Sequence, residues 1–266
     1  MTALRYKIAM IPFANMGPYR QLGIPDGAKW VDLPPRQSSD ELIKGTIVAA
    51  AAPIGDFARL EPVCDFIGQY GIAAKERVGS VMFFSRVPFS EIDHTHRIKL
   101  SFMSASSVRL LYLLLGYRQG FDALPFLAGP NEAYDGELVI GDSALKRALD
   151  SSRETYVTDL VAEWYRAFEL PFVFARWVIR KDAPARIRSE LEDWLEPLKE
   201  NDEDFVYASA KREAERLGIP KEPMVEYLLG MRRVLGSEEL AGQKKFIEEF
   251  MTHGREPVFE LGKVKE

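Results

Sequence analysis

The stretch "RIKLSFMSASSVRLLYLLLGY" (residues 97–117) decides the fold class, because it passes from strand to polar turn to helix without a break. Its helical part is strongly apolar and closes near Gly116. The stretch "GELVIGDSALKRALDS" (136–151) repeats this order, and "YKIAMIPFANMGPYRQLG" (6–23) also begins as a strand and turns polar at Asn15. Repeated strand–turn–helix units predict an α/β architecture.

The remaining elements follow from the same patterns. We expect strands at "TIVAAAA" (46–52), "GSVMFFSRVP" (79–88) and "FVFARWVIRKD" (172–182), and a short helix over 38–45 that starts with a Ser38–Glu41 capping box. Beyond residue 182 apolar residues recur at three- and four-residue spacing, which predicts purely helical structure with a scaffolding role.

Composition narrows the classes of partner. With 266 residues, 47% of them hydrophobic, the chain can bury a large core as one domain or two lobes. Its net charge of −5 gives no electrostatic footprint for nucleic acid or an anionic membrane, and no apolar run approaches the roughly 18 residues of a membrane helix. Nucleic acid and an anionic membrane are therefore not the expected partners.

Cysteine and histidine usage indicate a reducing compartment and no metal centre. Cys64 is the only cysteine, which excludes an intramolecular disulfide, and its neighbours favour a small core residue over a nucleophile. Pro12 interrupts the first apolar run, so we expect a first strand rather than a signal peptide and a cytoplasmic protein. The "DHTH" segment (93–96) reads as a polar loop rather than a metal pair, and no phosphate-binding glycine loop occurs, so we predict no cofactor.

Four motifs carry a resemblance to a known family. They are "VGSVMFFSRVP", "SFMSASSVRLL", "LVIGDSAL" and "DLVAEWYRAFELPFVFARWVIRKD", in this order. From residue 6 to about 250 the chain resembles the chorismate dehydratase family of the futalosine route to menaquinone. The resemblance implies a type 2 periplasmic-binding-protein-like fold, with a ligand cleft between two α/β lobes and C-terminal helices. Lobe one would comprise 1–87 plus 171–266, lobe two 88–170, with "SVMFFSR" and "FVFARWVI" as crossovers.

The resemblance implies a hydro-lyase that converts chorismate to 3-[(1-carboxyvinyl)oxy]benzoate and water. The alternatives are a related enzyme resembling 1,4-dihydroxy-6-naphthoate synthase and a non-catalytic binding protein for a carboxylated ring compound. The sequence does not predict the oligomeric state.

Two residues are candidates for catalysis. Asn15 matches the family's functional asparagine, and its carboxamide can donate and accept hydrogen bonds without adding charge. Asp142, at a strand end, either orients a substrate hydroxyl or takes a proton, or it caps the helix that follows. The substrate's own enolpyruvyl carboxylate is the alternative base.

The candidate binding residues are mostly neutral donors for two carboxylates. Hydroxyls and free N–H groups converge at the start of the helix that follows residue 104, although plain capping explains such serines as well. A strand-end arginine can pair with a carboxylate but is more often a surface residue. The candidates are Ser80, Arg86, Ser104, Ser106, Ser107 and Asp56.

One segment departs from the family pattern. Asp56 stands where the family has a glutamate, and Pro53-Ile54 stands where it has a Ser-Ser pair. Because we expect the family's serines to face the cleft, we predict a raised KM for chorismate.

Overall fold

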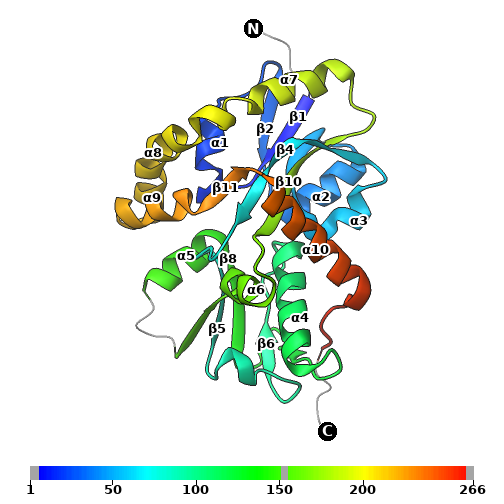
Figure 1. The fold of residues 1–266 in the computed structure, drawn as a ribbon, viewed down its shortest axis with the longest axis vertical. Coiled ribbons are helices and arrows are strands. Elements are labelled where there is room, and N and C mark those ends of the chain that lie inside the picture. The colour runs from blue at the N-terminus through cyan, green and yellow to red at the C-terminus, as the bar shows by residue number, and fades with distance from the viewer. Residues whose placement is uncertain (1–5, 151–154, 262–266) are drawn as a thin grey trace.

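The computed structural model describes residues 6–150 and 155–261, which form two separate sheets (Figure 1). The first sheet has six strands, in the spatial order β11 (Met231–Val234), β4 (Cys64–Ala74), β10 (Phe172–Arg180), β3 (Ala49–Pro53), β1 (Tyr6–Met10) and β2 (Ala28–Asp32). Helices lie around it: α1 (Gly17–Gln21), α2 (Pro35–Lys44), α3 (Phe57–Leu60), α7 (Ala185–Leu195), α8 (Leu198–Leu217) and α9 (Lys221–Leu229).

The second sheet forms the lower lobe in Figure 1. Its five strands are, in order, β7 (Phe126–Leu127), β6 (Arg97–Lys99), β8 (Gly136–Ile140), β5 (Val81–Ser85) and β9 (Tyr156–Asp159). The helices α4 (Ala105–Gln119), α5 (Gly141–Leu149) and α6 (Leu160–Phe168) belong to this lobe. The predicted α/β fold with two lobes is confirmed.

The chain crosses between the sheets earlier than expected. The strand β5 pairs with β8 and β9, so the first crossover lies in residues 75–80 rather than in "SVMFFSR", and lobe two begins before residue 88. The second lies between α6 and β10, because β10 pairs only within the first sheet.

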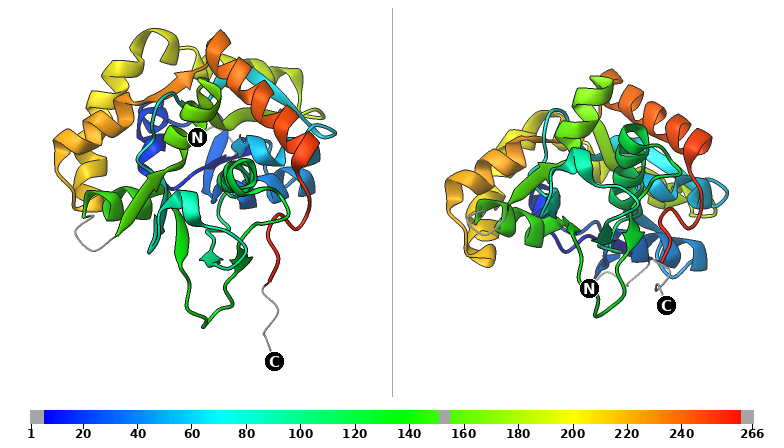
Figure 2. Two further views of the ribbon diagram at one scale, coloured as in Figure 1. Left: turned by 60° about the horizontal axis from the view of Figure 1, so that its bottom comes forward. Right: turned by 90° about the horizontal axis from the view of Figure 1, so that it is seen from below.

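The C-terminal part also departs from the expected boundaries. Helix α10 (Ser237–His253) packs against both β10 and α4, and the segment after it descends beside lobe two (Figures 1 and 2). Leu261 bridges to Leu127 of β7, and Phe259 packs on Tyr112 of α4. This tail therefore belongs with lobe two and not with lobe one.

Local differences have local causes. Helix α2 begins at Pro35 instead of Ser38, because proline suits the first helical turn, and it ends at Gly45 in the left-handed conformation, as expected. The region beyond residue 182 is not purely helical: β11 pairs with β4 at the sheet edge. Four residues are too few to show a strand period.

One continuous hydrophobic core joins the two lobes. The largest group of buried apolar side chains runs from the first sheet through α4 to the second, and includes Trp164, Trp177 and Phe83. Within the described residues, no helix is both long and apolar enough to span a bilayer.

Candidate active site

A cavity lies where the two lobes meet, and it collects the polar ends of several elements. Asn15 comes from the turn after β1, Ser80 from the first crossover, and Ser104 and Ser107 from the start of α4. Gly141, which directly follows β8 and is the first residue of α5, also lines the cavity. Carboxyl ends of strands and amino ends of helices thus converge at one place, as expected for a ligand site in α/β folds.

The cavity is small in this conformation. It measures about 50 Å³, whereas small-molecule pockets typically measure roughly 300–1,000 Å³. Its apolar walls come from Phe13, Ile72 and Phe174. A ring compound therefore requires the lobes or these side chains to move apart before it can enter.

Asn15 lies in the cavity with a free acceptor. The side-chain Oδ1 of Asn15 is buried and has no hydrogen-bond partner among the described residues. A buried amide oxygen without a partner costs on the order of 1–3 kcal/mol, so the site holds a polar group ready for a ligand. The family match that singled out Asn15 thus leads to a residue of this cavity.

Ser104 and Ser107 serve the helix and face the cavity at once. Ser104 is the N-cap of α4, and its Oγ accepts hydrogen bonds from the Ser107 backbone N–H at 3.3 Å and the Ser107 hydroxyl at 3.2 Å. Since its oxygen accepts both bonds, the Ser104 hydroxyl proton stays available as a donor. Capping and binding are therefore compatible at this helix start.

Ser106, by contrast, is engaged outside the cavity. Its hydroxyl donates to the Phe174 carbonyl at 2.7 Å and accepts from the Gly55 N–H at 2.9 Å. A Cβ at Gly55 would lie 2.6 Å from the Ser106 nitrogen, so only glycine allows this close approach. The Ser106 hydroxyl joins the strand ends of lobe one to α4 and does not line the cavity.

Ser80 has a partner that the sequence did not reveal. The Tyr227 hydroxyl donates to Ser80 Oγ at 3.1 Å, and the Ser80 carbonyl accepts from the Gly141 N–H at 2.7 Å. Tyr227 lies on α9, in the region to which the sequence assigned only scaffolding. An amphipathic pattern marks Tyr227 as a packing residue, and no local signal distinguishes its hydroxyl.

The cavity lining contains no aspartate, glutamate, histidine, lysine or arginine. Positive electrostatic potential comes instead from the amino end of α4, which has no acidic residue in its first turn, whereas at α5 the Gly141 N–H donates to the Ser80 carbonyl and Asp142 lies in the first turn. Such a site can bind an anion through neutral donors, and it offers no protein side chain that titrates near neutral pH.

Arg86 lies far from the cavity. The strand β5 starts at the cavity beside Ser80 and runs away from it, which puts Arg86 roughly 20 Å further along the chain. Its side chain is exposed, and its backbone N–H donates to the Asp135 carbonyl at 2.9 Å. The structure therefore does not bring Arg86 together with the other candidates.

Asp142 joins the lobes beside the cavity but does not line it. Its Oδ1 accepts from the backbone N–H of Ala14 at 2.8 Å, and its Oδ2 accepts from the Arg216 guanidinium at 2.7 Å. Arg216 of α8 also pairs with Glu213 at 2.7 Å. Both oxygens of Asp142 are occupied by contacts with lobe one, so the residue is a latch between lobes rather than an available base.

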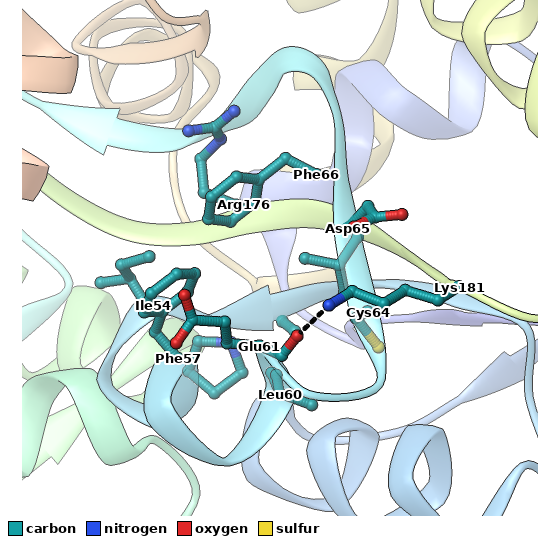
Figure 3. A pocket seen from close by; sticks show the side chains of 12 residues that line it. Ile54, Phe57, Leu60, Glu61, Cys64, Asp65, Phe66, Arg176 and Lys181 are labelled. Atoms are coloured by element: carbon teal, nitrogen blue, oxygen red, sulfur yellow. Dashed lines mark hydrogen bonds between the residues drawn. The ribbon is translucent and has the colours of Figure 1, made fainter.

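Asp56 and the Pro53-Ile54 segment face other cavities. Asp56 is buried and lines a 660 Å³ cavity beside α10, with Arg59 Nη1 at 3.7 Å from its Oδ1. Pro53 and Ile54 line a third cavity of 230 Å³, shown in Figure 3, where Ile54 and Phe57 lie across from Arg176. None of these three residues lines the cavity that holds Asn15.

The cysteine and histidine predictions can be compared directly. Cys64 is buried, and burial raises the pKa of its thiol to about 11, which fits a core residue. His96 Nδ1 lies 2.9 Å from Asp93 Oδ1 in the loop before β6, in agreement with the predicted polar loop. Across residues 6–150 and 155–261, no cluster of three or more His, Cys, Asp or Glu side chains is arranged to hold a metal ion.

Two α/β lobes with a cavity between them are typical of the class of periplasmic-binding-protein-like folds. A protein from Archaeoglobus fulgidus is similar with a TM-score of 0.67 and 15% identity, over 94% of this chain and 97% of that one. The alkanesulfonate-binding protein SsuA from Xanthomonas axonopodis pv. citri, bound to MOPS, gives a TM-score of 0.64 and 14% identity over 95% and 93%. At these identities the comparison establishes the fold alone.

The sequence narrows this class to one family. A family model described as menaquinone biosynthesis matches residues 6–251, and the chain belongs to this family. The curated chorismate dehydratase of Thermus thermophilus is 27% identical over 270 residues, covering 91% of this chain and 94% of the relative. The chain is thus a homologue of chorismate dehydratase, and the resemblance predicted from its motifs is confirmed.

Proposed function

We propose that this protein is a hydro-lyase that converts chorismate to 3-[(1-carboxyvinyl)oxy]benzoate and water. The family and the Thermus relative support the substrate and reaction. The observation that carries the proposal is the uncharged inter-lobe cavity, in which Asn15 and three serines offer neutral donors and acceptors. We also propose a cytoplasmic location, because the single, reduced Cys64 fits a reducing compartment.

The amino end of α4 suits one of the two carboxylates of chorismate. The hydroxyls of Ser104 and Ser107 at this helix start would bind one carboxylate, whereas the Gly141 N–H at the start of α5 already donates to the Ser80 carbonyl at 2.7 Å. Binding by neutral groups in a closed cavity is effective, because the low local dielectric strengthens each hydrogen bond. Phe13 and Phe174 would pack on the ring.

The proton transfer would be assisted by the substrate. Because no ionisable side chain lines the cavity, the enolpyruvyl carboxylate of chorismate is the nearest base for the ring hydrogen at the ether-bearing carbon. The electron pair of that C–H bond forms the new ring double bond, and the neighbouring hydroxyl departs and takes up the proton to leave as water. Asn15 and Ser80 would hold the departing hydroxyl, and aromatisation supplies the driving force.

The test is to incubate the purified protein with chorismate and follow the aromatic product by chromatography. A Ser80→Ala variant is the matched control, since it removes one hydroxyl of the cavity without changing charge. We expect product well above the spontaneous background and less with the variant. No product from the wild type, together with tight binding of a carboxylated ring in a thermal-shift assay, would favour a binding protein or a related enzyme instead.

A further inference from the structure

We propose that Tyr227 is a positioning residue that fixes the direction of the Ser80 hydroxyl, so that Ser80 presents its proton to the ligand. This inference rests on the proposed function of the inter-lobe cavity. It concerns a side chain on α9, outside every motif that carried the family resemblance. The contact behind it is the 3.1 Å hydrogen bond from the Tyr227 hydroxyl to Ser80 Oγ.

The direction of this hydrogen bond follows from burial. Tyr227 is buried, and a buried phenol proton needs an acceptor, which Ser80 Oγ supplies. Desolvation by burial raises the pKa of Tyr227 far above its ordinary value, so the phenol keeps its proton and acts as a donor. A serine oxygen that accepts this bond must direct its own proton elsewhere.

The other contacts of Ser80 leave the cavity as the direction in which its hydroxyl proton points. Its carbonyl is occupied by the Gly141 N–H at 2.7 Å, which fixes the backbone at the start of β5. Ser80 is only 3% exposed, and it lines the cavity beside Asn15 and Ser107. In an uncharged cavity the orientation of each hydroxyl sets the local potential, because no side-chain charge overrides it.

The bond also joins the two lobes. Tyr227 belongs to α9, which packs on α8 and β11 of the first sheet, whereas Ser80 ends the crossover into the second sheet. The Tyr227 donor and the Ser80 acceptor therefore meet because the lobes are together. This arrangement ties the donor direction of Ser80 to the closed conformation.

The experiment is a double-mutant cycle of Tyr227→Phe and Ser80→Ala, measured as kcat/KM with chorismate. Losing one such hydrogen bond typically costs about 0.5–1.5 kcal/mol, so Tyr227→Phe should lower kcat/KM about 2- to 13-fold in the wild type. In the Ser80→Ala background the same change should have almost no effect, because its target is gone. Tyr112→Phe is the matched control: its buried hydroxyl donates to the His253 carbonyl at 2.7 Å, away from the cavity, and activity should be unchanged.

The outcomes separate the inference from the proposed function. Equal losses from Tyr227→Phe in both backgrounds would show a purely structural role and overturn the inference, as would full activity of the single variant. If wild-type protein makes no product, the proposed function fails, and the same cycle is measured by calorimetric titration with 3-hydroxybenzoate. Weaker binding by Tyr227→Phe only when Ser80 is present would still support positioning, and additive or absent effects would reject it.

Discussion

The change Asp142→Asn decides between a catalytic and a structural role for the carboxylate that the sequence proposed as a base. The asparagine keeps an oxygen for the Ala14 N–H, which Asp142 Oδ1 now accepts at 2.8 Å. It removes the charge that pairs with Arg216 at 2.7 Å. A latch should tolerate this change, whereas a general base would lose its function.

The expected cost follows from exposure. The Arg216 side chain is 42% exposed, so solvent screens the pair, and its loss should cost about 0.2–1 kcal/mol. That amounts to roughly a 1.5- to 5-fold loss in the population of closed lobes and hence in apparent affinity. The change Asp142→Ala also leaves the buried Ala14 N–H without an acceptor, which adds about 1–3 kcal/mol.

Steady-state kinetics with chorismate give the assay, and denaturant unfolding confirms that each variant is folded. We expect KM to rise in the order wild type, Asp142→Asn, Asp142→Ala, with kcat changed several-fold at most. General bases contribute about 10²- to 10⁴-fold to rate. A hundredfold fall in kcat for folded Asp142→Asn, with KM unaltered, would refute the latch and restore Asp142 as a catalytic group.

Four further outcomes follow from the same geometry. Asn15→Ala should lower kcat by about 10² or more while the far-ultraviolet circular dichroism spectrum stays unchanged, because one preorganised contact is lost; wild-type kcat would remove Asn15 from the site. Arg86→Ala should leave kcat/KM unaltered, since the side chain lies on the surface away from the cavity. The double change Pro53→Ser, Ile54→Ser should not recover affinity and should destabilise the fold by about 2–4 kcal/mol in denaturant unfolding, because Ile54 is buried beside α3. A plot of kcat against pH should be flat from about pH 6 to 9, since the cavity has no titrating side chain, and a bell-shaped curve would point to a protein acid or base.

Much of the fold was predictable because long, periodic segments dominate it. The strand, turn and helix of residues 97–117 appear as β6, the Ser104 cap and α4, and the first strand appears as β1. The strands β4 and β11 were missed for different reasons. In residues 64–74 buried and exposed positions do not alternate regularly, because the pairing with β10 has register shifts. The strand β11 is a short edge strand between helices.

The sequence could predict residues of the candidate site only where they lie beside the end of a strand or the start of a helix. Asn15, Ser80, Ser104 and Ser107 all line the cavity, because each sits beside the end of an element that points there. Side-chain orientation cannot be predicted in this way. Ser106 is next to Ser107 in the helix, but its hydroxyl donates to the Phe174 carbonyl instead of lining the cavity. Tyr227 reaches the site from α9 by tertiary packing, which no local pattern encodes.

The Asp142–Arg216 pair and the uncharged cavity lie apart, and the distribution of charge gives a reason. An ionic contact holds the lobes together through Asp142 and Arg216 at the rim, where partial exposure limits both its strength and its desolvation cost. Inside, a fixed cation would bind the anionic substrate and the anionic product almost equally and would gain little in the transition state. In the proposed reaction, the hydroxyls of Ser80, Ser104 and Ser107 and the amino end of α4 would lie around the ring and would favour the charge distribution that develops during elimination. Because neutral donors are most effective when water is excluded, such a site depends on closure, and the Asp142–Arg216 pair joins the lobes from outside the cavity lining.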